Sequence, residues 1–174
     1  MPATEVFLKR VLETSINALV ALAAVLVIYQ VVVQNRVSRP RQVAAGDRLT
    51  NIGGIAWGEH QSTLLLAVRK GCHFCEESMP FYQRLVALRD QHQTDTQLVA
   101  VFPDSEGEAH GVLKNARLDS IGLASGVPLA GINVTGTPTL ILVDKRGVVS
   151  RAWIGRLTPD GEGEVIEALK PRSP

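Results

Sequence analysis

The sequence predicts an α/β domain with a mixed central sheet, preceded by one apolar helix. The helix is indicated by 19 residues, Ser15–Val33, that contain no charged side chain. The domain is indicated by short apolar runs, bounded by polar residues, that alternate with stretches of helical periodicity. Such runs are typical of strands buried on both faces, and strands that alternate with helices favour an α/β fold.

Length and composition limit the class of protein. The 174 residues suffice for one domain with an appendage, since a single core commonly takes about 100 to 200 residues. With 45% hydrophobic and 20% charged residues, the chain can bury a core and is not globally disordered. Two cysteines are too few for a multi-disulfide scaffold or a four-cysteine zinc site.

The apolar stretch predicts a membrane helix, because about 20 such residues span a bilayer core. Ser15–Val33 is apolar all round, whereas a buried core helix is normally amphipathic. A cleaved signal peptide is the main alternative, since Lys9 and Arg10 form a basic start and Ala44-Ala45 offers small residues for cleavage. The apolar region of a signal peptide, however, is about 7 to 15 residues long and ends close to the cut. We therefore predict an uncleaved signal-anchor.

We divide the chain into an anchor at residues 1–34, a tether at 35–46 and a globular domain at 47–174. The tether contains Pro40 and shows no helical periodicity. Residues 1–46 carry five basic and two acidic side chains, whereas 47–174 carry 13 basic and 15 acidic ones. This balance gives no support for nucleic-acid binding, and anionic lipid headgroups are the simpler explanation of the basic tether.

The basic residues on the two sides of the span bear on its orientation. Lys9 and Arg10 precede it. Four arginines follow it, namely Arg36, Arg39, Arg41 and Arg48. By the positive-inside rule this count favours a cytoplasmic domain.

The domain is predicted to contain four main strands and three helices. In chain order they are a strand at Leu64–Val68, a helix from the first cysteine to about His92, a strand at Leu98–Phe102, a helix between Glu106 and Asp119, strands at Thr139–Val143 and Val148–Ile154, and a helix at Asp160–Leu169. Residues 121–134 are rich in Gly and Ser, so we predict mostly loop there, with a short strand near its end.

The two cysteines form a Cys-x-x-Cys pair between a predicted strand and a predicted helix. At a helix start the free N–H groups and the helix dipole stabilise an anion, so Cys72 can be a thiolate near neutral pH. Cys75 lies one turn further on, within reach of a disulfide. Nearby positive charge comes from Arg69, Lys70 and, when protonated, His73.

This arrangement is typical of a redox pair. The thiolate attacks in disulfide exchange and a second thiol resolves the mixed disulfide, so Cys72 is the predicted nucleophile and Cys75 the resolving thiol. Three other interpretations are open: two buried structural cysteines, a static disulfide, or half of a metal site.

A proline precedes the third main strand, in the dipeptide Thr137-Pro138. Proline cannot donate to a sheet ladder, so its backbone geometry is usually what a strand start requires. A cis bond before Pro138 would turn the Thr137 backbone outward, where it could pair with an extended substrate segment. An ordinary strand-edge proline is the alternative.

These motifs occur in a fixed order along the domain. They are the apolar strand Leu64–Val68, Cys72-His73-Phe74-Cys75, Pro80 in the following helix, Thr137-Pro138, the strand Thr139–Val143 and the turn Asp144-Lys145-Arg146-Gly147. As a set they resemble the thioredoxin superfamily, and more narrowly its membrane-anchored thiol-disulfide oxidoreductases of the TlpA type.

The resemblance implies a thioredoxin-like fold tethered outside the cytoplasm by an N-terminal helix, against the arginine count. It implies that Cys72 attacks and that Pro138 is cis and faces the disulfide. The chain departs from the family where Gly71 replaces a common tryptophan, in its His-Phe dipeptide and in a first strand without an acidic residue.

Two neighbours of the cysteines are candidate modulators. His73 either stabilises the thiolate when protonated or is an exposed loop residue. Glu76 is either a helix-start carboxylate favoured by the dipole or a proton shuttle.

The predicted function is that of a membrane-tethered thiol-disulfide oxidoreductase, with its domain on the periplasmic side. It would act on protein disulfides, require a redox partner and use no cofactor or metal. The alternatives are a copper- or zinc-binding module that uses Cys72, Cys75 and a histidine, and a redox-silent interaction domain.

Overall fold

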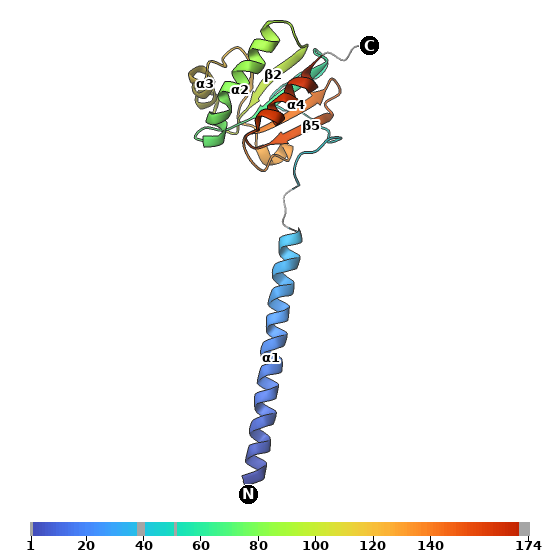
Figure 1. Cartoon of the computed structure of the whole chain (residues 1–174), viewed down its shortest axis with the longest axis vertical. Coiled ribbons are helices and arrows are strands. Elements are labelled where there is room, and N and C mark those ends of the chain that lie inside the picture. The colour runs from blue at the N-terminus through green and yellow to red at the C-terminus, as the bar shows by residue number, and fades with distance from the viewer. Residues whose placement is uncertain (1, 38–40, 51, 171–174) are drawn as a thin grey trace. The chain divides into compact units, whose positions relative to one another are not determined.

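The structure, a computed structural model, describes residues 2–37, 41–50 and 52–170. The chain divides into two compact units, Met1–Pro40 and Arg41–Pro174, which are treated separately below. Figure 1 shows the helix of the first unit and the α/β arrangement of the second.

The first unit consists of one helix, α1 (Pro2–Val37). Its segment Ser15–Val32 has a mean hydropathy of 2.2, and none of that segment is buried. In the described part of the chain, α1 is the one helix long and apolar enough to cross a membrane. The predicted span therefore coincides with a candidate membrane helix.

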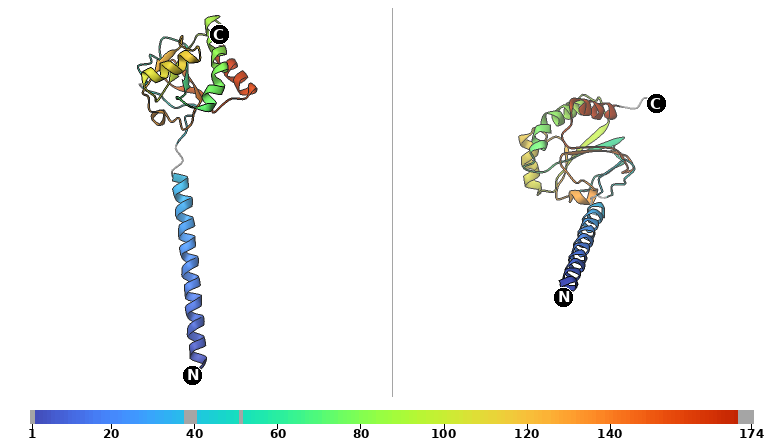
Figure 2. Two further views of the ribbon diagram at one scale, coloured as in Figure 1. Left: turned by 90° about the vertical axis from the view of Figure 1, so that its left-hand side faces the viewer. Right: turned by 60° about the horizontal axis from the view of Figure 1, so that its bottom comes forward.

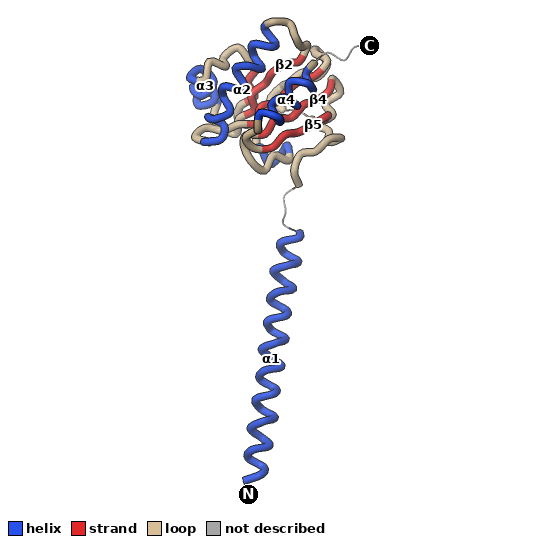
Figure 3. Tube along the Cα trace, viewed as in Figure 1, coloured by secondary structure: helices blue, strands red, loops and turns tan. Residues whose placement is uncertain are grey.

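The second unit is built on a five-stranded mixed sheet of order β3-β2-β1-β4-β5 (Figure 3). β1 pairs with β2 in parallel and with β4 antiparallel, so it occupies the centre of the sheet. The elements are β1 (Ser62–Ala67), α2 (His73–Asp90), β2 (Thr96–Val101), α3 (Glu106–Asn115), β3 (Gly122–Ala124), a 3-10 turn (Leu129–Ile132), β4 (Thr139–Asp144), β5 (Val149–Ile154) and α4 (Pro159–Leu169).

Both faces of this sheet are covered. Leu64 and Leu66 of β1 belong to one core with side chains of α2, α3 and α4. Leu65 and Ala67 belong to a second core on the other face, with the 3-10 turn and the segment before β1. Figure 2 shows α2 and α4 on one side of the strands and the 3-10 turn on the other. Burial of alternate residues on opposite faces explains why Leu64–Ala67 of β1 is a continuous apolar run.

The predicted order of strands and helices is confirmed, and so is the mixed α/β fold. The prediction for residues 121–134 is wrong in one respect, because the short strand β3 lies near the start of this segment and the end forms the 3-10 turn. Glycine at position 122 suggested a loop. In the structure a Cβ there would lie 3.1 Å from a methyl of Val99, so glycine permits the close pairing of β3 with β2.

The second unit begins before the boundary that the sequence pattern suggested. Val43 is 3% exposed, belongs to the second core and donates its N–H to the Asn133 carbonyl at 2.8 Å. Next to it, the Thr135 hydroxyl donates to Oε1 of Gln42. Compact structure thus starts at Arg41, whereas the pattern placed the start at residue 47.

The turn between β4 and β5 is held by Asp144. Its Oδ1 accepts the N–H groups of Arg146 at 2.8 Å and Val148 at 3.0 Å. Partial burial would raise the pKa of Asp144, but these donors and the Arg146 guanidinium outweigh it and hold the pKa below its usual 3.8. Gly147 has a φ of +78°, and a Cβ there would lie 2.9 Å from the Leu49 carbonyl. The predicted turn is confirmed, with glycine at the position that requires it.

Candidate active site

The helix α2 starts at the first cysteine. Cys72 has an extended backbone (φ −88°, ψ 107°), and its carbonyl accepts the N–H groups of Cys75 at 3.0 Å and Glu76 at 3.1 Å. The Sγ of Cys72 also accepts the Cys75 N–H at 3.2 Å. The sulfur thus occupies the capping position, where free N–H groups and the positive end of the helix stabilise negative charge.

Cys72 and Cys75 form a disulfide, with their Cα atoms 5.2 Å apart. Cys72 is 7% exposed and Cys75 is 1% exposed. Of the two, Cys72 is therefore the more accessible to another molecule. This difference supports the order of attack predicted from the sequence.

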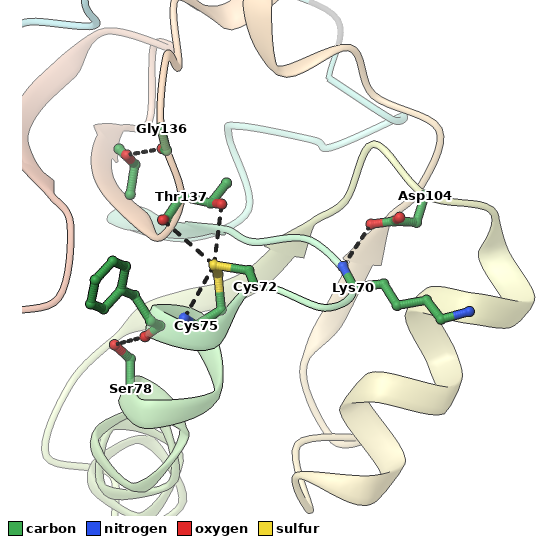
Figure 4. Close-up of a disulfide and its surroundings, with 9 residues drawn as sticks. Lys70, Cys72, Cys75, Ser78, Asp104, Gly136 and Thr137 are labelled. Atoms are coloured by element: carbon green, nitrogen blue, oxygen red, sulfur yellow. Dashed lines mark hydrogen bonds between the residues drawn. A yellow bond between two sulfur atoms is a disulfide. The ribbon is translucent and has the colours of Figure 1, made fainter.

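A loop 65 residues further along the chain faces the Cys72 sulfur (Figure 4). The Thr137 hydroxyl donates to Sγ at 3.3 Å, and the Thr137 carbonyl oxygen lies 3.5 Å from it. The bond between Thr137 and Pro138 is cis. The sulfur therefore has two donors directed at it, the Thr137 hydroxyl and the Cys75 N–H.

The loop that contains Thr137 has a backbone N–H group beside the sulfur that is available for hydrogen bonding. Among the residues that the structure describes, the Thr137 N–H has no hydrogen-bond partner. On either side the loop is held, since Gly155 donates to the Pro138 carbonyl at 2.7 Å and the Thr139 hydroxyl donates to the Gly136 carbonyl at 2.8 Å. Thr137 is thus a fixed residue with a free backbone donor.

An open cleft of about 590 Å³ adjoins Cys72. It is lined by Arg69, Gly71, Cys72, His73, Phe74, Pro103, Leu129, Val134, Thr135, Gly136 and Thr137. Phe74 is apolar, and its side chain is 55% exposed. It lies in the first turn of α2. The cleft can therefore offer an apolar surface to a substrate.

The predicted modulators lie at the helix start without touching the sulfur. His73 is exposed, and its Nε2 lies 3.3 Å from Oε1 of Glu77. The other oxygen of Glu77 accepts from Arg156 at 3.0 Å. Glu76 is exposed. The pairing of Arg156 with Glu77 was not predicted, because no motif connects residues 79 positions apart.

Lys70, predicted to add positive charge, is engaged elsewhere. Its ammonium lies 3.0 Å from Glu108, and its N–H donates to Asp104 at 3.0 Å. A hydrogen bond from the Ser105 hydroxyl, together with Lys70, holds the pKa of Glu108 below its usual value. The Lys70 charge is thus shared with α3.

Few side chains near the cysteines could bind a metal ion. The described residues contain no group of three or more His, Cys, Asp or Glu side chains arranged to hold a metal ion. At the cysteines the available soft ligands are two sulfurs, and His73, the nearest histidine in sequence, is directed to Glu77. A metal site at Cys72 would therefore lack a third ligand from these residues.

Comparisons with known proteins identify the fold. No protein-family model and no curated protein matches the chain. Among solved structures, the thioredoxin domain of a thiol-disulfide oxidoreductase from Bacteroides vulgatus is 17% identical, with a TM-score of 0.59 over 75% of this chain and 100% of that one. A thiol:disulfide interchange protein DsbE from Chlorobium tepidum is 22% identical, with a TM-score of 0.57 over 74% of this chain and 99% of the other.

The second unit therefore has the thioredoxin-like fold, with a Cys-x-x-Cys disulfide at the start of α2. The fold is also shared with a peroxiredoxin-like protein from Aquifex aeolicus, which is 12% identical with a TM-score of 0.56 over 74% of this chain and 88% of that one. Since one fold carries more than one chemistry, the function has to be argued from the site.

Proposed function

We propose that this protein is a thiol-disulfide oxidoreductase that exchanges electrons with protein disulfides through Cys72 and Cys75. The observation that carries the proposal is the placement of the Cys72 sulfur at the N-terminus of α2, where it accepts hydrogen bonds from the Thr137 hydroxyl and the Cys75 N–H. After reduction these donors stabilise a thiolate, which is the attacking species in exchange.

The reaction proceeds in two balanced steps. The Cys72 thiolate attacks one sulfur of a client disulfide, forms a mixed disulfide and releases the other client sulfur as a thiolate, which takes up a proton. Cys75 then loses its proton and attacks Sγ of Cys72, which releases the second client thiolate and closes the Cys72–Cys75 disulfide. Two electrons have passed from the Cys72 and Cys75 thiols to the client. A redox partner then supplies two electrons that reduce the Cys72–Cys75 disulfide again. Every step is reversible.

Thr137 and Pro138 are proposed to position the client. A main-chain carbonyl of an extended client segment would accept a hydrogen bond from the free N–H of Thr137. This hydrogen bond would align the client cysteine with Sγ of Cys72. Pairing through main-chain atoms tolerates many sequences, which suits an enzyme that acts on protein disulfides.

Reduction of insulin by the full-length protein in detergent tests this function. With dithiothreitol as electron donor, the protein should accelerate precipitation of the insulin B chain, followed by turbidity. The matched control is the same protein, reduced and then blocked at both thiols with N-ethylmaleimide. Equal rates for the active and the blocked protein would overturn the proposal.

We further propose that residues 1–34 anchor the protein in a membrane and that the thioredoxin-like unit lies on the periplasmic side. The apolar window of α1 supports the anchor. The orientation rests on the family resemblance, and the four arginines after the span favour the opposite side.

A membrane-impermeant maleimide decides the orientation. In spheroplasts treated with a permeant reductant, Cys72 should be labelled before lysis. Labelling that requires lysis would place the unit in the cytoplasm. A cytosolic thiol protein serves as the control for intact membranes.

A further inference from the structure

One carboxylate near the disulfide is held at both oxygens. Oε1 of Glu77 lies 3.3 Å from Nε2 of His73, and Oε2 accepts from Nη1 of Arg156 at 3.0 Å. His73 and Glu77 are one turn apart on α2, whereas Arg156 follows β5. The Glu77 side chain is 33% exposed, whereas those of Arg156 and His73 are 57% and 76% exposed, so water screens these charges substantially.

The segment that carries Arg156 also holds the loop opposite the sulfur. Gly155 donates its N–H to the Pro138 carbonyl at 2.7 Å, and Thr137, before Pro138, contacts Sγ of Cys72. Residues 155 and 156 are thus bonded to both walls of the site: the loop through Gly155 and the start of α2 through Arg156.

The ionisable side chains of the cysteine segment and of the elements in contact with it come from four parts of the chain. The segment before α2 provides Arg69 and Lys70, α2 provides His73, Glu76 and Glu77, the residues after β2 and in α3 provide Asp104 and Glu108, and the segment after β5 provides Arg156. The 133–138 loop has no ionisable side chain.

Most of these charges are already paired with one another. Lys70 is paired with Glu108, so its charge is shared with α3. Of the two carboxylates near the start of α2, Glu77 is the one with ion-pair partners among the described residues.

An uncompensated carboxylate at this end of α2 would oppose a thiolate. We propose that Arg156 is a positioning residue for the exchange reaction: it neutralises Glu77 and fixes it against His73, so that the Glu77 charge does not oppose formation of the Cys72 thiolate. The inference rests on the proposed function, in which Cys72 attacks as a thiolate. It assigns a role to a residue that no sequence motif marks.

The test is the pH dependence of alkylation of Cys72 by iodoacetamide in the reduced full-length protein, with the modified residue identified by mass spectrometry. Arg156→Met removes the charge and keeps the length of the side chain. It should slow alkylation at pH 6 by about two- to five-fold and move the midpoint of the profile upward, which corresponds to an ion pair of a few tenths to 1 kcal/mol. High salt should reduce the difference, because it screens the charges.

A second variant separates charge from packing. Glu77→Gln should not slow alkylation, and the double variant Arg156→Met/Glu77→Gln should recover the wild-type rate, since the opposing carboxylate is gone. Arg84→Met is the matched control, because Arg84 lies on α2 but pairs with Glu162 of α4. It should leave the profile unchanged.

The outcomes are distinct. An unchanged profile in Arg156→Met overturns the inference, and so does a double variant as slow as the single one, since a structural defect would not be repaired by removing Glu77. Failure of the wild-type protein to reduce insulin would overturn the proposed function instead, while the alkylation profiles would still measure the effect of Arg156 on the thiol.

Discussion

Replacing Cys75 with serine is expected to trap the protein in a covalent complex with its client. Cys72 can still attack a disulfide, but the thiol that would release the mixed disulfide is gone. In the wild-type protein Cys75 is held beside Cys72, with the two Cα atoms 5.2 Å apart, so its thiol is the one placed to resolve the intermediate. Non-reducing gels of the full-length variant mixed with a disulfide-containing client should show a high-mass band that dithiothreitol removes.

The complementary variant, Cys72→Ser, should form no such band and should reduce insulin no faster than dithiothreitol alone. The two variants differ in one sulfur each, so they distinguish the attacking from the resolving cysteine. A stable complex in Cys72→Ser and none in Cys75→Ser would reverse the proposed roles.

Truncation of Leu64 is expected to have the largest effect on stability. This side chain is fully buried in β1, the central strand, opposite Leu98 of β2 and Leu142 of β4. Leu64→Ala should lower the free energy of unfolding by about 2 to 5 kcal/mol, from the lost burial and the cavity that remains. Since domains are commonly stable by about 5 to 15 kcal/mol, the loss is a large share of the total.

Urea unfolding in a non-ionic detergent measures this effect. The fluorescence of the two tryptophans reports the transition, since Trp153 belongs to the same core as Leu64 and Trp57 packs against the second core. Ile154→Ala is the matched control, because Ile154 is 52% exposed on the edge strand β5 and should cost less than about 1 kcal/mol. Equal losses in the two variants would contradict the placement of Leu64 at the centre of the core.

The central strands were predictable because a strand buried on both faces needs apolar residues at successive positions. This requirement produces a continuous apolar run that is visible in the sequence. Leu64–Val68 is a continuous apolar run for this reason, and the observed strand differs from it only at its ends. The contact between Thr137 and Cys72 could also be predicted, since the two motifs occur together in the family that the sequence resembles. The first feature is a local pattern, and the second followed from the resemblance.

Other features depend on contacts that a local pattern does not contain. Arg156 meets Glu77 because the segment after β5 lies beside the start of α2, and Arg156 resembles any other surface arginine in the sequence. Phe74 is apolar, but its exposure depends on which side chains pack around the first turn of α2. For β3, glycine was taken as a loop signal, whereas the close approach of Val99 is what requires it.

The hydrogen bonds that join residues 42 and 43 to the 133–135 segment have a practical consequence for preparing the protein without its helix α1. A version trimmed at residue 47, where the sequence pattern changes, would lose Val43 from the second core and the Gln42 acceptor of the Thr135 hydroxyl. Thr135 lines the cleft beside Cys72, so the damage would reach the site itself. A trimmed version that starts at Arg41 retains both contacts and the wall of the cleft that they support.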